Sequence, residues 1–163
     1  MTNFYEICAL CGPRKISSDD IPALLIRLDH EIGWLITQNV TRFRIIPSPG
    51  FNFFAALTVL NLKRNFPETE LEAIVGNFNN NLKSEDIEVR DFIISHADLI
   101  SEIRIPPRGL SGNILSEVLT KDCSYLITYA KTDLGFCSHA RERADICGQQ
   151  IIYTEKSCVG VSV

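Results

Sequence analysis

The sequence has no hydrophobic run long enough to cross a membrane. Its longest apolar stretches are short, as at Ala23 to Ile26 and Phe53 to Leu57, whereas a membrane-spanning helix needs about 20 apolar residues. The N-terminal residues Met1 to Glu6 also lack the basic segment followed by an apolar segment that marks a secretory signal. We therefore expect a cytoplasmic protein.

A basic block is absent as well. The 16 Lys and Arg residues are spread along the chain and are outnumbered by 20 Asp and Glu, which gives a formal net charge of −4. Nonspecific nucleic-acid binding needs a concentrated positive surface, so the sequence gives no strong signal for a nucleic-acid partner. A length of 163 residues with 45% hydrophobic and 22% charged residues predicts one globular domain spanning residues 1–163.

Paired metal-ligand motifs are missing too. Among six cysteines, Cys8 and Cys11 form a CxxC pair, but no second closely spaced pair of Cys or His completes a zinc site. A thioredoxin-type pair would lie at a helix N-terminus, whereas Cys8 lies in an apolar, strand-like run. We expect no metal and no cofactor, and we interpret the thiols as small buried hydrophobes. Metal and redox roles are the alternatives.

What the sequence does have is a regular alternation of strand and helix patterns. Short apolar or β-branched runs predict strands, and apolar residues at helical spacing predict helices. The predicted strands are 4–10, 41–46, 71–75, 99–103, 125–129 and 150–154. The predicted helices are about 21–39, 52–65, 85–97, 113–121 and 138–147. This order predicts an α/β fold of three layers, Rossmann-like, with a mostly parallel sheet covered by helices on both faces.

Open parallel sheets bind ligands beyond the C-terminal ends of their strands, where helix N-termini favour anions. Three loops occupy such positions, at 12–15, 47–52 and 133–138. Glycines there allow close backbone approach, an arginine can grip a phosphate, and polar side chains can bind the same anion. The candidate ligand-binding residues are Gly12, Arg14, Ser48, Gly50, Asn52, Gly135, Cys137 and Ser138. A purely structural role for the glycines, a solvated Arg14 and an inert Cys137 are the alternatives.

In chain order, these segments resemble a known family. They are Cys11 to Arg14, Thr41 to Ala56, Ala97-Asp98, Asp122 to Ile127 and Gly135 to Cys137. They resemble the TGHR-like turn, the TxFxSGGAxGxDxWAAE segment, the AD pair, the D-x-SD-x-LI run and the GGT turn of the YpsA-like branch of the SLOG superfamily. That Rossmann-like superfamily includes DprA and the lonely-guy proteins. The resemblance implies a nucleotide-derived ligand, such as a nucleotide or an ADP-ribose-like molecule.

Several family residues are replaced. The His of the first turn becomes Pro13, a Gly-Gly pair becomes Ile46-Pro47, the acid becomes Asn52, and Phe136 stands at a glycine position. Pro47 removes an N–H donor, and Asn52 carries no carboxylate. These replacements work against the family's phosphate-binding chemistry, so either the ligand differs or the site has lost its function.

Three functions follow from these observations. The first is a non-catalytic module that binds a nucleotide-derived ligand at the strand ends. The second is a degenerate domain that acts through protein contacts, as a homodimer or with a partner, because aromatics such as Trp34, Phe51 and Phe136 would mark an interface if they were exposed. The third is a hydrolase of nucleotide N-glycosides. The lonely-guy motif PGGxGTxxE is absent, which disfavours catalysis, and the sequence identifies no catalytic residue.

Overall fold

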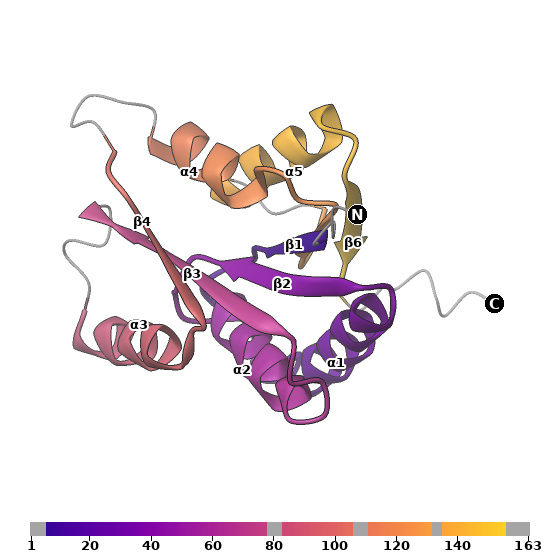
Figure 1. Ribbon diagram of the computed structural model, residues 1–163. Coiled ribbons are helices and arrows are strands. Elements are labelled where there is room, and N and C mark those ends of the chain that lie inside the picture. Colours follow the sequence, from indigo (N-terminus) through magenta and orange to yellow (C-terminus); the bar gives the residue numbers. More distant parts are fainter. Residues whose placement is uncertain (1–5, 78–82, 106–110, 132–134, 156–163) are drawn as a thin grey trace.

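Figure 1 shows the computed structural model of the chain, which describes residues 6–77, 83–105, 111–131 and 135–155. The strands are β1 (Glu6–Leu10), β2 (Val40–Ile45), β3 (Glu70–Gly76), β4 (Leu99–Ile103), β5 (Tyr125–Thr128) and β6 (Gln150–Tyr153). The helices are α1 (Ile21–Thr37), α2 (Phe51–Lys63), α3 (Ser84–His96), α4 (Ser111–Thr120) and α5 (Phe136–Ile146). Strands and helices alternate throughout, as the sequence predicts.

The strands form one sheet in the order β4-β3-β2-β1-β5-β6, and every neighbouring pair is parallel. Helices α1, α2 and α3 cover one face, and α4 and α5 cover the other (Figure 1). The predicted three-layer Rossmann-like fold is confirmed. From β1 the chain moves outward to β4, crosses the opposite face in α4, and resumes at β5 on the other side of β1. The direction of the connections therefore reverses between β1 and β5.

The sequence of α1 explains why this segment is a helix and which side it buries. Leu24, Leu28, Ile32 and Leu35 recur every three or four residues, and all four are buried against the sheet. Pro22 occupies the first turn, where its missing N–H costs nothing. Helix α1 ends at Thr37, just before Asn39, which has a φ of 70°.

Element boundaries differ from the predictions by at most two residues, and the bounds of β4 coincide with the prediction. Helix α5 begins at Phe136, two residues before the predicted Ser138. Helix α2 begins at Phe51, one residue earlier than predicted, and ends at Lys63, two residues earlier than predicted. In both cases a glycine with positive φ immediately precedes the helix. Residues 1–5, 78–82, 106–110, 132–134 and 156–163 lie outside the described residues.

The core is divided between the two faces of the sheet. One cluster packs α1, α2 and α3 on the sheet and includes Cys8, while the other packs α4 and α5 and includes Cys11. Cys8 and Cys11 are three residues apart on an extended segment, so their side chains emerge on opposite faces. The CxxC motif therefore contributes one thiol to each core. Among the described residues, no helix has both the length and the apolar character to cross a bilayer.

Candidate functional site

The C-terminal ends of β1 and β5 define the location where this fold type binds ligands. The two strands are neighbours, with Leu10 paired to Ile127, and their following helices cover opposite faces of the sheet. The place where two neighbouring strands send their connections to opposite faces of the sheet is a topological switch point, and a crevice opens there. The predicted loops around Gly12 and Gly135 flank this crevice, and the loop around Gly50 follows the next strand, β2.

On the β2 side, the loops are packed directly against each other. A Cβ at Gly12 would overlap the ring of Phe51, which is fully buried at the start of α2. A Cβ at Gly50 would overlap the main chain of Arg14, and the Phe51 N–H donates to the Pro13 carbonyl at 3.0 Å. Both glycines are therefore required for loop-to-loop contact, which is the structural role that the sequence left open.

Asn52 connects these two loops through its side-chain amide. Its Oδ1 accepts the Gly12 N–H at 3.2 Å, and its Nδ2 donates to the Ile46 carbonyl at 2.8 Å. The residue is only 6% exposed. The Gly12 N–H, which could otherwise bind a phosphate, is thus used within the protein. An asparagine suits this position because it supplies both a donor and an acceptor, whereas a carboxylate offers only acceptors.

Arg14 extends away from the crevice. Its Nη2 lies 2.5 Å from Asp86 Oδ2, in the first turn of α3, which follows β3. Since β3 and β5 lie on opposite sides of β1 in the sheet, this contact directs the guanidinium away from Gly135. Its side chain remains 56% exposed, so the ion pair is largely solvated. The structure therefore does not bring the charged group of Arg14 to Gly135.

On the β5 side, the described residues leave the helix end uncovered. Gly135 precedes α5 with φ 71° and ψ −132°, and no side chain among the described residues caps this end. Within the described part of the chain, no atom lies within 4 Å of the position of a Cβ at Gly135. Ser138, in the same first turn, is half-buried. The first N–H groups of a helix favour anions, so this end retains the property on which the predicted site depends.

Cys137 links the same helix end to β1. It is 7% exposed, and its Sγ lies 3.4 Å from the Sγ of Cys11, which directly follows β1 and is 2% exposed. The sequence identified Cys137 as a candidate but gave no sign of this partner, because the two residues are separated by 126 positions. Ser48 is half-buried beside the buried Pro47.

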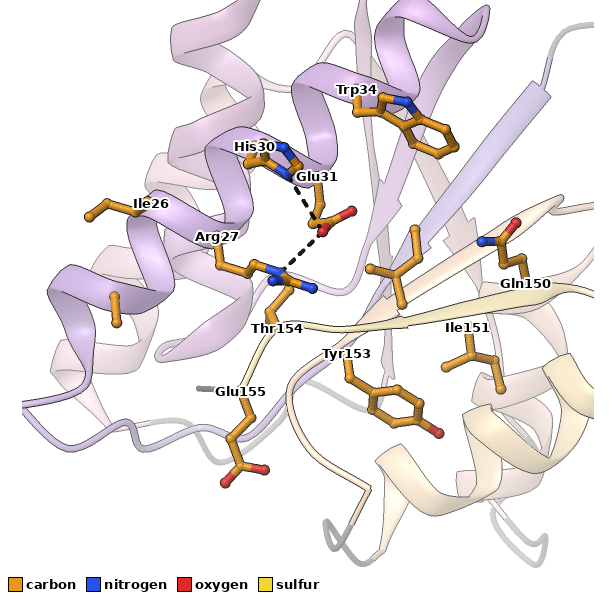
Figure 2. A pocket seen from close by; sticks show the side chains of 12 residues that line it. Ile26, Arg27, His30, Glu31, Trp34, Gln150, Ile151, Tyr153, Thr154 and Glu155 are labelled. Carbon is orange, nitrogen blue, oxygen red and sulfur yellow. Dashed lines mark ion pairs between the residues drawn. The ribbon is translucent and has the colours of Figure 1, made fainter. Parts of the chain in front are cut away.

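A groove lies elsewhere, between α1 and the edge strand β6 (Figure 2). Its volume is about 1110 Å³. Helix α1 contributes Ile26, Arg27, His30, Glu31 and Trp34, and β6 with the two following residues forms the opposite wall. Glu31 Oε1 lies 3.1 Å from Arg27 Nε and 3.6 Å from His30 Nδ1. Ile26 and Trp34 are 73% and 43% exposed, so a considerable apolar area faces solvent here.

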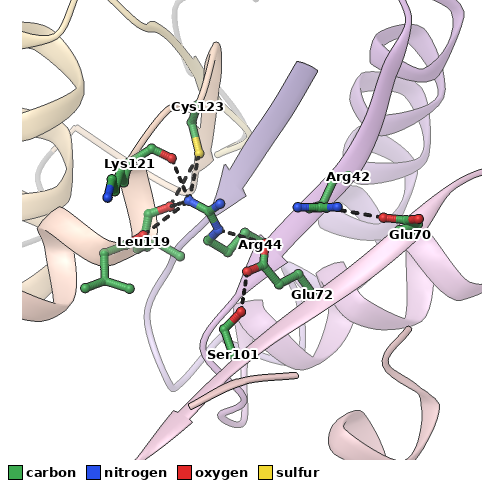
Figure 3. A network of polar contacts seen from close by, with 9 residues as sticks. Arg42, Arg44, Glu70, Glu72, Ser101, Leu119, Lys121 and Cys123 are labelled. Carbon is green, nitrogen blue, oxygen red and sulfur yellow. Dashed lines mark hydrogen bonds and ion pairs between the residues drawn. The ribbon is translucent and has the colours of Figure 1, made fainter. Parts of the chain in front are cut away.

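A buried polar network holds α4 on the sheet (Figure 3). Arg44 on β2 donates through Nε to Glu72 on β3 at 2.9 Å. Its Nη1 donates to the carbonyls of Val118, Leu119 and Lys121 at the end of α4, at 3.2, 3.1 and 2.7 Å. A cation at a helix C-terminus satisfies the last carbonyls and is favoured by the helix dipole. This network is structural, and no local pattern in the sequence indicated it.

Cys123 lies at the edge of this network, with its Sγ 3.6 Å from Arg44 Nη1. Burial raises the pKa of the Cys123 thiol to about 12, even though the nearby Arg44 charge acts to lower it. Burial also raises the pKa of Cys8 well above its ordinary value. Both thiols therefore stay protonated at neutral pH, as expected for structural cysteines.

Comparisons with known proteins place the fold in context. No protein-family model matches the chain, and no curated protein sequence matches it. Among solved structures, the chain is similar to the X-ray structure of DNA processing protein A (DprA) from Streptococcus pneumoniae, with a TM-score of 0.59 and 12% sequence identity. The match covers 91% of this chain and 49% of that one, so this chain spans about half the length of DprA. This chain therefore shares its Rossmann-like fold with part of DprA.

Proposed function

We propose that this protein is a divergent SLOG-like domain, related to the YpsA-like branch, that binds a nucleotide-derived anion without catalysing a reaction. The observation that carries the proposal is the open N-terminus of α5 at Gly135, beside the β1–β5 switch point. The first main-chain N–H groups of a helix point out of its N-terminal end and favour a phosphate there, and Ser138 adds a hydroxyl in the same turn. The ligand class is that of a nucleotide or an ADP-ribose-like molecule.

The closed side of the site supports binding rather than catalysis. Asn52 replaces the family's acid and uses both ends of its amide within the protein, so it supplies no base. Arg14 is paired with Asp86. The proposed anion site at the switch point therefore consists of main-chain N–H groups and the Ser138 hydroxyl, which suit a phosphate and include no group for proton transfer.

Calorimetric titration with AMP, ADP-ribose and inorganic phosphate tests this proposal. Ser138→Asp places a carboxylate in the first turn of α5, where it favours the helix but repels an anionic ligand. We expect it to weaken binding at least tenfold. Ser84→Asp adds the same charge to the first turn of α3 and is the matched control, with affinity unchanged. Arg14→Ala should reduce affinity less than Ser138→Asp does.

The absence of heat with all three ligands would refute the proposal. So would equal effects of Ser138→Asp and Ser84→Asp, because binding would then depend on net charge rather than on the α5 end.

The groove between α1 and β6 supports a second function, self-association. Strand β6 pairs with β5 on one side, and its other side is an edge of the sheet in the described part of the chain. A two-fold axis perpendicular to the sheet would pair two β6 edges antiparallel and place the two α1 helices side by side. A second copy of this chain is therefore the partner that we propose for the groove.

The residues of α1 are complementary to themselves under such an axis. In an antiparallel helix pair centred near His30, Ile26 lies opposite the partner subunit's Trp34, four residues from the centre in each direction. Arg27 then lies close to the partner subunit's Glu31, which pairs opposite charges. Apolar contacts with Ile26 and Trp34 would cover two of the most exposed large side chains on this face.

Light scattering after size-exclusion chromatography tests this arrangement. We expect a concentration-dependent dimer for the unchanged protein and a monomer for Trp34→Glu. Ile146→Glu is the matched control because Ile146 is 68% exposed on α5, at the opposite face, and its change should leave the dimer intact. A monomer at every concentration would exclude the arrangement, as would an equal loss of the dimer in the control.

A further inference from the structure

Two thiols meet at the switch point although they are far apart in sequence. Cys11 directly follows β1, Cys137 is in the first turn of α5, and their Sγ atoms are 3.4 Å apart. A disulfide bond has an S–S length of about 2.05 Å, so the sulfurs need to approach by roughly 1.4 Å to bond. We propose that Cys11 and Cys137 are a modification site that forms a reversible disulfide on exposure to a hydroperoxide.

The surroundings of the other thiols favour this pairing over the CxxC pairing suggested by the sequence. Cys8 lies in the core cluster on the opposite face of the sheet from Cys11, so the two cannot bond without rebuilding β1. Cys123 shares the face of Cys11, but its Sγ donates to the Leu119 carbonyl at 3.4 Å and lies near Arg44. Among the described residues, Cys137 is the thiol that the fold brings into contact with Cys11.

The position of Cys137 suits it for the first chemical step. A helix N-terminus favours an anion, which assists formation of the reactive thiolate. Cys137 is 7% exposed against 2% for Cys11, and within the described part of the chain no atom lies within 4 Å of a Cβ position at Gly135, two residues earlier, so a small peroxide reaches Cys137 before Cys11. The Cys137 thiolate attacks an oxygen of the hydroperoxide, which breaks the O–O bond, releases an alcohol and leaves a sulfenic acid. The Cys11 thiol then attacks the sulfenic sulfur and expels water.

Atoms and electrons balance over the two steps. Two thiols and one hydroperoxide give one disulfide, one alcohol (water when the oxidant is hydrogen peroxide) and one water. The two sulfurs are oxidised and the peroxide oxygens are reduced. The product ties the end of β1 to the first turn of α5 and closes a chain loop of 126 residues. Such a long closed loop restricts the unfolded chain strongly, so the oxidised protein should be more stable than the reduced protein.

To test the proposal, the reduced full chain is treated with one equivalent of hydrogen peroxide. The protein is then digested without a reductant, and its peptides are mapped by mass spectrometry. We expect a cross-linked pair containing Cys11 and Cys137, together with a rise in Tm of about 10 °C that dithiothreitol reverses. In Cys11→Ser the Tm rise should vanish, and a sulfenic-acid probe such as dimedone should label Cys137. Cys11→Ala repeats this test if the serine variant does not fold.

The matched control is Cys147→Ser/Cys158→Ser, which removes two other thiols and should keep both the cross-link and the Tm rise. Cys147 is exposed and would otherwise form bonds between molecules. The proposal is overturned if peroxide leaves no Cys11–Cys137 peptide. It is also overturned if the control loses the Tm rise, or if Cys11→Ser retains it.

Discussion

Gly50 and Gly135 occupy equivalent places in two strand–helix units, yet their surroundings are opposite. Each is the residue before a helix, and their backbone angles agree closely, with φ/ψ of 77°/−133° and 71°/−132°. Around Gly50 the main chain of Arg14 fills the space of a Cβ, whereas around Gly135 that space is open among the described residues. Among the described residues, the same turn therefore closes the β2 side of the site and leaves the β5 side uncovered.

The largest expected loss of stability comes from replacing the two glycines by alanine, which adds a methyl group to each turn. Gly50→Ala and Gly135→Ala share the cost of a backbone conformation that L-residues rarely adopt, about 1–3 kcal/mol each. Gly50→Ala adds an overlap with the Arg14 main chain, so we expect its total loss of unfolding free energy to exceed about 3 kcal/mol. Urea unfolding of the two variants measures the difference. Equal losses would show that the two turns are equally packed.

The second largest loss of stability is expected when the Asn52 amide bridge on the β2 side is removed. Asn52→Leu leaves the partly buried Gly12 N–H and Ile46 carbonyl without their side-chain partner. Such losses cost about 1–3 kcal/mol per buried group, so we expect the unfolding free energy to fall by about 2–4 kcal/mol. Equilibrium unfolding gives this value, with Asn65→Leu on the exposed segment after α2 as the control. A change below about 0.5 kcal/mol would mean that the bridge is unimportant.

Restoring the family's acid sharpens the comparison further. In Asn52→Asp a carboxylate keeps the acceptor for Gly12 but faces the Ile46 carbonyl with a second acceptor. We expect a loss of about 1–3 kcal/mol at pH 7. The folded variant favours the protonated acid, which can donate to Ile46, so the loss should shrink as the pH falls through the carboxyl range. Unfolding curves at pH 7 and pH 4 test this sign, and a loss that grows on acidification would contradict it.

The smallest effect concerns Arg14, whose exposed ion pair with Asp86 lies at the outer margin of the closed side. Exposed pairs contribute about 0.2–1 kcal/mol, so Arg14→Ala and Asp86→Ala should each change stability by less than about 1 kcal/mol. A double-mutant cycle isolates the coupling between them. A coupling free energy above about 2 kcal/mol would show that the Arg14–Asp86 ion pair helps to hold the packed loops on the β2 side together.

The fold follows from sequence patterns that act over short distances. The spacing of Leu24, Leu28, Ile32 and Leu35 predicts α1 and its buried side, and the alternation of elements predicts the parallel sheet. The strand-end position of the loops follows from that alternation. The sequence predicts α5 from Ser138, whereas the helix begins at Phe136, directly after Gly135.

The contacts within the site depend on segments that local patterns do not connect. Asn52 binds Gly12 across 40 positions, and Cys11 meets Cys137 across 126. A sequence pattern shows that Gly12 and Gly50 lie at strand ends, but only the packing of Phe51 and the Arg14 main chain shows what they contact. Phe51, considered as a candidate exposed aromatic, is fully buried for this reason, whereas Trp34 is partly exposed.

The guanidinium of Arg44 has a consequence for the order of folding. Its partners at the end of α4 lie 74 to 77 positions further along the chain. Joining segments so distant carries a large loop-closure entropy, so this contact forms slowly unless the intervening chain is already compact. Strands β1 to β4, with their three helices, supply that compact platform and place Glu72 beside Arg44. We therefore expect the segment from β1 to β4 to fold ahead of α4, so that the growing polypeptide assembles one layer of helices before the other.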